Sequence, residues 1–571
     1  MNTRHTLWLA GFASILVIAA CESADEGYEG EPAPVEDAAA PPPPPPPPPS
    51  PSMAMEKSNR VATAPTAGMA PPQQVPQPMP GDVDRERYED VEINPVKLVA
   101  EEPVSTFSID VDTASYAVAR RYLNDGTLPP KDAIRIEELI NYFDYAYPMP
   151  AGPENPFSMN VNLAPSPWAE GRELMQVGIQ GYDIELEERP PLNLTLLIDV
   201  SGSMSSEDKL PLAKKALAML IDEMSEEDSV SIAVYAGAAG EVLEPTQATE
   251  ANKGKILAAF ENLSAGGSTA GGEGLRLAYS LAERNLEPDG VNRVMLLTDG
   301  DFNVGINDPE RLEDFVSRKR ETGIYLSVMG FGTGNYNDAL MQKIAQTGNG
   351  TAGYVDSLNE ARKLLKDDLS GNLFPIADDV KIQVEFNPAR VAEYRLIGYE
   401  TRMLNREDFN NDAVDAGDIG AGTSVTAIYE ITTTDSDARL IDESRYAEAP
   451  EATNEDMSDE YAFLKLRQKA PGADSSKLVT RPITTADYTA GIEESPQWAR
   501  FATAVAGYGQ LLRGDPYTAT DYGFDDVIAL AQTARGEDEF GYRAEFINLA
   551  RLAKTAVAQA RLEREGETRP Q

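Results

Sequence analysis

The stretch Leu194-Thr-Leu-Leu-Ile-Asp-Val-Ser-Gly-Ser203 is the most informative part of this 571-residue chain. Its first half is almost uninterruptedly apolar, as in a strand that is buried on both faces of a parallel sheet. Its second half changes to small polar residues that follow a carboxylate. A buried strand that ends in Asp199, Ser201 and Ser203 predicts an α/β domain with polar groups at the carboxyl edge of its sheet.

The sequence around this stretch alternates between short apolar runs and amphipathic segments. The strand candidates are 194–199, 230–235, 293–298, 324–331 and 353–356. The helix candidates are 210–224, 253–263, 274–284, 309–321, 338–347 and 359–370. Gly323 and Gly348 fall where two of these helices should end. This alternation predicts a doubly wound, mostly parallel sheet, with any ligand site at the carboxyl ends of its strands.

Three loops carry oxygen-bearing side chains at that edge. Asp199, Ser201 and Ser203 lie in the first loop, Thr269 lies in a glycine-rich second loop, and Asp299 follows the strand 293–298. Two carboxylates and three hydroxyls form an all-oxygen ligand set, which suits Mg²⁺ or Mn²⁺ better than Zn²⁺ or copper. Because Mg²⁺ takes six oxygen ligands and commonly keeps water, one position would remain for a ligand from outside.

The spacing is D-x-S-x-S, then a Thr 70 residues and an Asp 100 residues after the first Asp. This pattern resembles the metal-ion-dependent adhesion site (MIDAS) of von Willebrand factor type A (VWA) domains. The resemblance implies that Ser201, Ser203 and Thr269 reach the ion through hydroxyls, with Asp199 and Asp299 as carboxylate ligands or water-bridged neighbours. It also implies a Rossmann-like domain that binds a partner protein, whose Asp or Glu completes the coordination of Mg²⁺ or, alternatively, Mn²⁺.

The regions that flank this domain contain further strand and helix candidates. Strands are expected at 157–163 and 174–179 before it, and at 380–386, 391–398 and 424–432 after it. We expect these strands to pair into one β-sandwich into which the VWA domain is inserted; two separate small domains are the alternative. Helices are expected at 112–125, 135–145, 496–512, 524–534 and 538–564. Asp112 or Thr113 is the expected N-cap of the first helix.

The stretches Phe107-Ser-Ile-Asp-Val-Asp-Thr-Ala-Ser-Tyr116, Arg135-Ile-Glu-Glu-Leu-Ile-Asn-Tyr-Phe143 and Asp299-Gly-Asp-Phe-Asn-Val-Gly305 are similar to bacterial YfbK-like VWA lipoproteins. The resemblance extends from near Pro95 almost to the end of the chain. It implies an N-terminal VWA-associated module over 93–188, the VWA domain over 189–374, a β-rich C-terminal module over 375–485 and a helical region over 486–571.

The N-terminus has the pattern of a secretion signal. Arg4 and His5 precede an apolar run that ends at Cys21, and this run is shorter than the roughly 18–20 residues that a spanning helix needs. Ile18-Ala-Ala-Cys21 resembles a lipobox, which implies a signal peptide over 1–20 and a lipid on Cys21 that anchors the protein in the bacterial cell envelope. By resemblance to the sorting signals of enterobacterial lipoproteins, Glu22 in place of Asp implies the outer membrane. Residues 21–92, with nine prolines at 41–49, are expected to form a disordered tether.

Composition excludes several classes of function. With 94 acidic and 49 basic residues, the formal charge of −45 repels nucleic acid and anionic headgroups. Cys21 is the only cysteine and His5 the only histidine, which excludes intrachain disulfides, Cys or His zinc sites, and every mechanism with a thiol nucleophile or a histidine base. We therefore expect a binding protein and no enzyme.

Two local motifs compete with the adhesion-site interpretation. Ser206-Glu-Asp-Lys209 matches the S-x-x-K motif of penicillin-binding enzymes, but its companion motifs are missing. The segment from Asp299 begins like a calcium-binding loop but has Val304 where such a loop requires glycine. At the level of the whole protein, a metal-dependent envelope hydrolase and a structural protein with a non-functional metal site remain the alternatives to cation-dependent protein binding.

Overall fold

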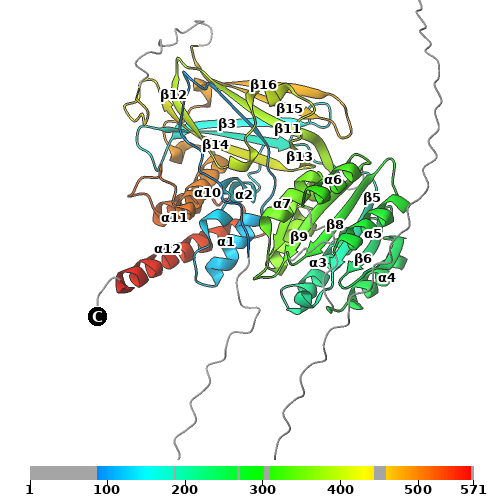
Figure 1. Cartoon of the computed structure of the whole chain (residues 1–571). Coiled ribbons are helices and arrows are strands. Elements are labelled where there is room, and N and C mark those ends of the chain that lie inside the picture. The colour runs from blue at the N-terminus through cyan, green and yellow to red at the C-terminus, as the bar shows by residue number, and fades with distance from the viewer. Residues whose placement is uncertain (1–85, 186–187, 267–270, 301–308, 443–457, 568–571) are drawn as a thin grey trace, which may run out of the picture. The chain divides into compact units, whose positions relative to one another are not determined.

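A computed structural model of the chain describes residues 86–185, 188–266, 271–300, 309–442 and 458–567 (Figure 1). Cys21, the proline run and Thr269 lie outside the described residues, as does the segment after Gly300 that resembles a calcium-binding loop. The predicted tether reaches residue 92, but the structure already places residues 86–88 against the folded body. Across the described ranges, no helix has the length and apolar character to cross a membrane.

A six-stranded sheet forms the centre of the region predicted to be the VWA domain. Its strands, in spatial order, are β10 (Ala352–Val355), β9 (Ile324–Phe331), β8 (Val291–Thr298), β5 (Leu192–Asp199), β6 (Ser229–Tyr235) and β7 (Ala239–Gln247). All neighbours run parallel except β6 and β7. The prediction of a doubly wound, mostly parallel sheet is confirmed. The edge strand β7 was not expected, because Pro245 and two glutamates are unusual in a strand. An exposed edge strand tolerates these residues.

Helices cover both faces of this sheet because successive residues of a strand point to opposite sides (Figure 1). Leu194, Leu196 and Ile198 of β5 enter a core with α3 and α4, whereas Leu197 enters a second core with α5, α6 and α7. The helices are α3 (Leu210–Glu223), α4 (Glu250–Glu261), α5 (Gly271–Arg284), α6 (Pro309–Arg320) and α7 (Asp338–Thr347). Burial on both faces explains why these strands are apolar throughout.

The segment 359–370, which was predicted to be one helix, forms three short elements. These are α8 (Leu358–Arg362), a π-helical turn (Lys363–Asp367) and α9 (Leu369–Leu373). The backbone N–H of Asp368 donates to the Lys363 carbonyl at 2.8 Å, which makes this turn wider than an α-helical one. Lys363 Nζ then lies 4.7 Å from the centroid of the Tyr142 ring. A tertiary contact therefore accompanies the departure from a regular helix.

The flanking strands form two further sheets. One has the order β1 (Lys97–Leu98), β12 (Val391–Ile397), β14 (Ser424–Thr433), β4 (Glu173–Gly181) and β3 (Phe157–Pro165). The other has the order β13 (Gly417–Gly420), β11 (Pro375–Phe386), β15 (Glu460–Lys469) and β16 (Ser476–Thr484), and β2 (Val104–Ser108) also pairs with β11. Because β4 pairs with β14 across the inserted domain, with Val177 opposite Ala427, the β-sandwich prediction is confirmed and the alternative of separate domains is wrong.

The N-terminal and C-terminal helices share one hydrophobic core. These helices are α1 (Ala114–Asn124), α2 (Ile136–Asn141), α10 (Gln497–Arg513), α11 (Phe524–Ala534) and α12 (Tyr542–Glu567). Helix α2 ends four residues earlier than expected, at Asn141, whose side-chain amide donates to the Asp110 carbonyl at 2.8 Å and accepts from the Thr426 N–H at 2.8 Å. This core joins the two ends of the described chain.

Candidate functional site

Asp199 and Asp299 leave the sheet at its carboxyl edge. The register of β5 and β8 pairs Ile198 with Leu297, so these adjacent strands deliver the two carboxylates to the same place. Both residues are fully buried, at 0% exposure. Burial and, to a smaller extent, the charge of Asp299 raise the pKa of Asp199, as expected for neighbouring buried carboxylates. The structure therefore brings together the two predicted acidic ligands.

Ser201 and Ser203 lie beside these carboxylates. The Ser201 N–H donates to Asp199 Oδ1 at 2.8 Å, and the hydroxyls of Ser201 and Ser203 are 2.9 Å apart. The Ser203 hydroxyl also bonds to Asp299 and lowers its pKa. A short 3-10 turn, Gly202–Ser205, fixes this loop, and its Met204 side chain is buried in the core below. Four of the five predicted metal ligands are therefore neighbours.

Thr269, the fifth predicted ligand, lies outside the described residues, but the structure places both ends of its loop. Before it, the Gly266 N–H donates to the Val200 carbonyl at 2.7 Å. After it, α5 packs so closely on the sheet that a Cβ at Gly274 would lie 2.7 Å from Tyr235 Cβ. The described residues on either side of Thr269 thus contact the loop of Asp199 and strand β6.

Burial raises the pKa of the Asp199 carboxyl to about 6, although the Ser201 N–H and the Tyr235 hydroxyl act in the opposite direction. Its Oδ1 accepts the hydrogen bond from the Ser201 N–H. Because burial of a carboxylate is costly unless other groups compensate its charge, this position favours a nearby cation. Asp199 therefore has the environment of a metal ligand.

Lys209 supplies a cation at this site that the sequence analysis did not assign to it. Its Nζ lies 3.0 Å from Asp299 Oδ2 and 3.0 Å from Asn335 Oδ1, and only 9% of its side chain is exposed. Burial alone would raise the pKa of Asp299, but the charge and hydrogen bond of Lys209, with Asn335 and Ser203, bring it below its usual value. The result is a compact arrangement of two carboxylates and one ammonium group.

One signal could have drawn attention to Lys209. It occupies the N-cap position of α3, where the positive end of the helix dipole disfavours a cation. A buried lysine at that position needs an acidic partner from elsewhere in the fold. In the sequence, Lys209 stood out only as part of the S-x-x-K motif, so this signal was overlooked. Asn335 gave no comparable signal, because isolated asparagines are common in loops.

The residues present fit a hard divalent cation. Among the residues that the structure describes, no three His, Cys, Asp or Glu side chains are grouped for metal binding. The set at Asp199 and Asp299 thus depends on serine hydroxyls and water to complete an oxygen shell, which suits Mg²⁺ or Mn²⁺. Lys209 neutralises only one of the two carboxylates, so the site still has a net negative charge to offer an ion.

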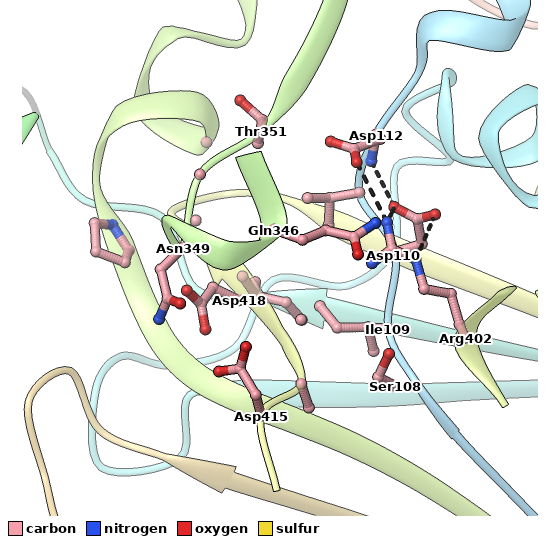
Figure 2. Close-up of a pocket in the computed structure, with 18 of the residues that line it drawn as sticks. Ser108, Ile109, Asp110, Asp112, Gln346, Asn349, Thr351, Arg402, Asp415 and Asp418 are labelled. Atoms are coloured by element: carbon pink, nitrogen blue, oxygen red, sulfur yellow. Dashed lines mark hydrogen bonds and ion pairs between the residues drawn. The ribbon is translucent and has the colours of Figure 1, made fainter. Parts of the chain in front are cut away.

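A separate cavity of about 220 Å³ lies where the VWA domain meets the β-sandwich (Figure 2). Asp110 and Asp112 line it, and Figure 2 shows Arg402 beside Asp110, with the two carboxylates 3.0 and 3.3 Å from the guanidinium. Asp112 also accepts from the Ala352 N–H at 2.8 Å. Of the two expected N-caps of α1, Thr113 takes that position, and it makes no side-chain cap bond. Their partners within the protein give these carboxylates a structural role.

Comparison with known proteins places the sequence in a family. The family models described as "von Willebrand factor", "von Willebrand factor type A domain" and "Uncharacterized protein YfbK, C-terminal" match residues 82–176, 193–367 and 371–556. Uncharacterized protein YfbK of Escherichia coli (strain K12) is 46% identical over 473 residues, which cover 82% of this chain and 81% of that protein.

Two more distant relatives match a smaller part of the chain. Uncharacterized protein sll0103 of Synechocystis is 34% identical over 33% of this chain and 43% of that protein. Inter-alpha-trypsin inhibitor heavy chain H3 of Mesocricetus auratus is 26% identical over 44% of this chain and 30% of that protein. Because the similarity to the Escherichia coli protein spans four fifths of both sequences, this chain belongs to the YfbK family of proteins with a von Willebrand factor type A domain.

Proposed function

We propose that this protein holds a partner protein through a divalent cation, most readily Mg²⁺, at the carboxyl edge of its VWA sheet. The observation that carries the proposal is the placement of Asp199 and Asp299, fully buried and adjacent, with the Ser201 and Ser203 hydroxyls beside them. The two carboxylates would hold the ion, and the hydroxyls would orient it. The ion would supply a concentrated positive charge for an outside ligand.

Charge at the site indicates the chemistry of that ligand. Two carboxylates and the Lys209 ammonium sum to one negative charge, so a bound dication leaves the site with one positive charge. Because both carboxylates are buried, that excess is screened less than in bulk water and attracts an anion more strongly. An Asp or Glu side chain of a partner protein matches this requirement, and the hard ion prefers its oxygen atoms.

The proposal includes a location in the bacterial cell envelope. Its support comes from the sequence, in which an apolar run ends at Cys21 and the proline-rich segment follows. A lipid on Cys21 would hold the VWA domain near a membrane surface, most readily that of the outer membrane, with the segment up to residue 85 as the spacer. Metabolic labelling with palmitate should mark the wild type and fail to mark Cys21→Ser; equal labelling would contradict a lipid at this residue.

Affinity capture from detergent-solubilised envelopes tests the metal bridge. The full-length chain is compared in Mg²⁺ and in EDTA, as wild type, as Asp199→Ala and as Glu207→Ala. Glu207 is an exposed carboxylate near the same loop and outside the predicted ligand set, so it controls for a change in charge alone. A partner retained only by the wild type and Glu207→Ala in Mg²⁺ would support the bridge.

The Lys209–Asp299 ion pair favours one alternative, a VWA domain whose site is purely structural. In that case the ion pair would serve the fold, and partner capture would depend on other surfaces. Equal recovery of a partner from all the samples, including Asp199→Ala in EDTA, would contradict the metal bridge and support this alternative. No observation in the described part of the chain favours the hydrolase alternative.

A further inference from the structure

We propose that Lys209 is a built-in competitor of the divalent cation and sets how tightly this site holds its metal. The inference rests on the proposed metal site but concerns a residue outside its ligand set. Lys209 Nζ lies 3.0 Å from Asp299 Oδ2 inside the fold, where a metal ion would draw on the same carboxylate. Either the ion displaces this ammonium group or the two cations share Asp299 at close range.

The fold holds Lys209 in this position from three sides. The residue opens α3, so its backbone is fixed by the helix, and the Ala213 N–H donates to its carbonyl at 2.8 Å. Gly332, with φ +75°, leaves space for the lysine stem, because a Cβ there would lie 2.2 Å from Lys209 Cγ. Asn335 accepts from Nζ on the far side at 3.0 Å. The lysine is therefore guided to Asp299 by the packing around it.

Repulsion between the ammonium group and a dication is substantial at this depth. Surface lysines are screened by water and ions, but this side chain is only 9% exposed and its partner is fully buried. When the metal binds, it must therefore overcome either the repulsion or the loss of the Lys209–Asp299 pair. The site then has a lower affinity for the metal alone than its two carboxylates would give.

A lower intrinsic affinity also gives the partner a larger role. Lys209 neutralises part of the negative charge of Asp299. The carboxylate of the partner restores negative charge around the ion. Metal and acidic ligand then reinforce each other's binding, as linked equilibria require. Lys209 would thus keep the affinity for the ion low until an acidic group of the partner binds. This effect would explain why a cation lies next to a metal ligand.

Isothermal titration calorimetry of the full-length chain with MnCl₂ tests this inference. We expect Lys209→Met, which keeps an unbranched side chain and removes the charge, to bind Mn²⁺ at least about tenfold more tightly than the wild type. Lys209→Arg should resemble the wild type because it keeps the charge. Lys214→Met is the matched control, since Lys214 lies on the same helix and donates to the Glu261 and Leu263 carbonyls instead.

The outcomes separate the inference from the proposed metal site. Equal Mn²⁺ affinity in the wild type and Lys209→Met would overturn the competitor role and leave the metal site intact. Mn²⁺ binding by Lys209→Met but not by the wild type would support the inference and show that Lys209 prevents the ion from binding alone. No binding by any variant would overturn both proposals.

A second measurement uses the wild type and so avoids any variant that fails to fold. Amine-selective labelling with mass spectrometry should show Lys209 becoming more reactive when Mn²⁺ is added, because its ammonium group leaves Asp299. Lys214 should keep its reactivity. Unchanged labelling of Lys209 at a Mn²⁺ concentration that saturates the site, together with equal Mn²⁺ affinity in Lys209→Met, would overturn the competitor role.

Discussion

Glu86 accepts a hydrogen bond from the Gly334 backbone N–H at 3.0 Å, which joins the first described residue to the loop between β9 and α7. The same carboxylate accepts from both Nη atoms of Arg121 at 2.6 Å. On the next residue of the chain, the Arg87 N–H donates to the Tyr336 carbonyl at 3.1 Å. The loop 332–337 also carries Asn335, so one loop contacts both the N-terminal segment and Lys209.

We expect Glu86→Ala to loosen this loop. The substitution removes the acceptor for Gly334 and leaves Arg121 without its carboxylate, at a cost of about 3 kcal/mol for a pair of this burial. Amide hydrogen exchange should become faster over 332–337, as read by mass spectrometry of proteolytic fragments. Glu89→Ala, which changes an exposed carboxylate three residues later, should leave the exchange as it is. Identical exchange in the two variants would contradict the anchoring role.

The junction between α7 and the N-terminal module should be sensitive to loss of charge. Arg135 donates to Asp338 at 2.7 and 3.1 Å and also pairs with Glu138, and all three groups are nearly buried. Arg135→Met would leave two buried carboxylates without their cation, so we expect a loss of about 3–5 kcal/mol in the free energy of unfolding.

Urea denaturation measures this loss. The control is Lys343→Met on α7, the helix that carries Asp338, because Lys343 pairs with Glu313 at 3.5 Å near the surface, with 58% of its side chain exposed. Exposed pairs of this kind contribute about 1 kcal/mol or less. A similar shift of the unfolding midpoint in both variants would show that burial of the Arg135 pair adds nothing.

The parts of the fold that the sequence predicted well are those governed by local pattern and burial. Helix α7 has the predicted bounds, Asp338–Thr347, because its apolar residues recur at helical spacing. Strand β9 also has its predicted bounds, Ile324–Phe331, because burial on both faces keeps it apolar. Asp199, Ser201 and Ser203 were predictable for the related reason that they end such a strand.

The parts that were not predicted depend on contacts between distant segments. Strand β15 alternates Leu464 and Leu466 with Lys465 and Arg467, a strand pattern that was overlooked, and its pairing with β11 and β16 is set by topology. At the site, Lys209 meets Asp299 and Asn335 only after separate loops converge. Glu86 follows a stretch whose composition resembles that of the predicted tether. The adjacent residues in the sequence do not indicate its hydrogen bond with Gly334. Such contacts are set by topology, which local periodicity does not encode.

Glu137 should make stability depend on pH in an unusual direction. Its carboxyl is fully buried, and burial, followed by the charges of Glu400 and Asp110, raises its pKa to about 8. Between the unfolded pKa of about 4.3 and the folded value, the folded state holds a proton that the unfolded state has released. Its contribution to stability therefore falls as pH rises through this window, by up to about 1.4 kcal/mol per pH unit.

Glu137→Gln should remove that dependence, because the neutral amide resembles the protonated carboxyl of the folded state. We expect the variant to gain stability relative to the wild type as pH rises from 5 to about 8, and the gain to level off above that pH. Urea midpoints at three pH values in this range and above it give the difference. Glu154→Gln, at an exposed loop position, should track the wild type. A constant difference between Glu137→Gln and the wild type would contradict the raised pKa.

Gly332 and Gly334 separate backbone strain from displacement of Lys209. Both glycines have positive φ, +75° and +91°, so alanine at either position should destabilise the loop by about 1–2 kcal/mol. A Cβ at Gly332 would also lie 2.2 Å from Lys209 Cγ, whereas a Cβ at Gly334 meets nothing within 4 Å. Only Gly332→Ala should therefore push the lysine away from Asp299.

We accordingly expect Gly332→Ala to bind Mn²⁺ more tightly than the wild type, and Gly334→Ala to bind it with unchanged affinity, by calorimetry. Thermal unfolding should show a similar loss of stability from backbone strain in both variants, with a further loss in Gly332→Ala from the clash. A rise in affinity in both variants would assign the effect to loosening of the loop. A rise in Gly332→Ala alone would assign it to the position of Lys209, because the two changes share their backbone strain and differ in what the new methyl group meets.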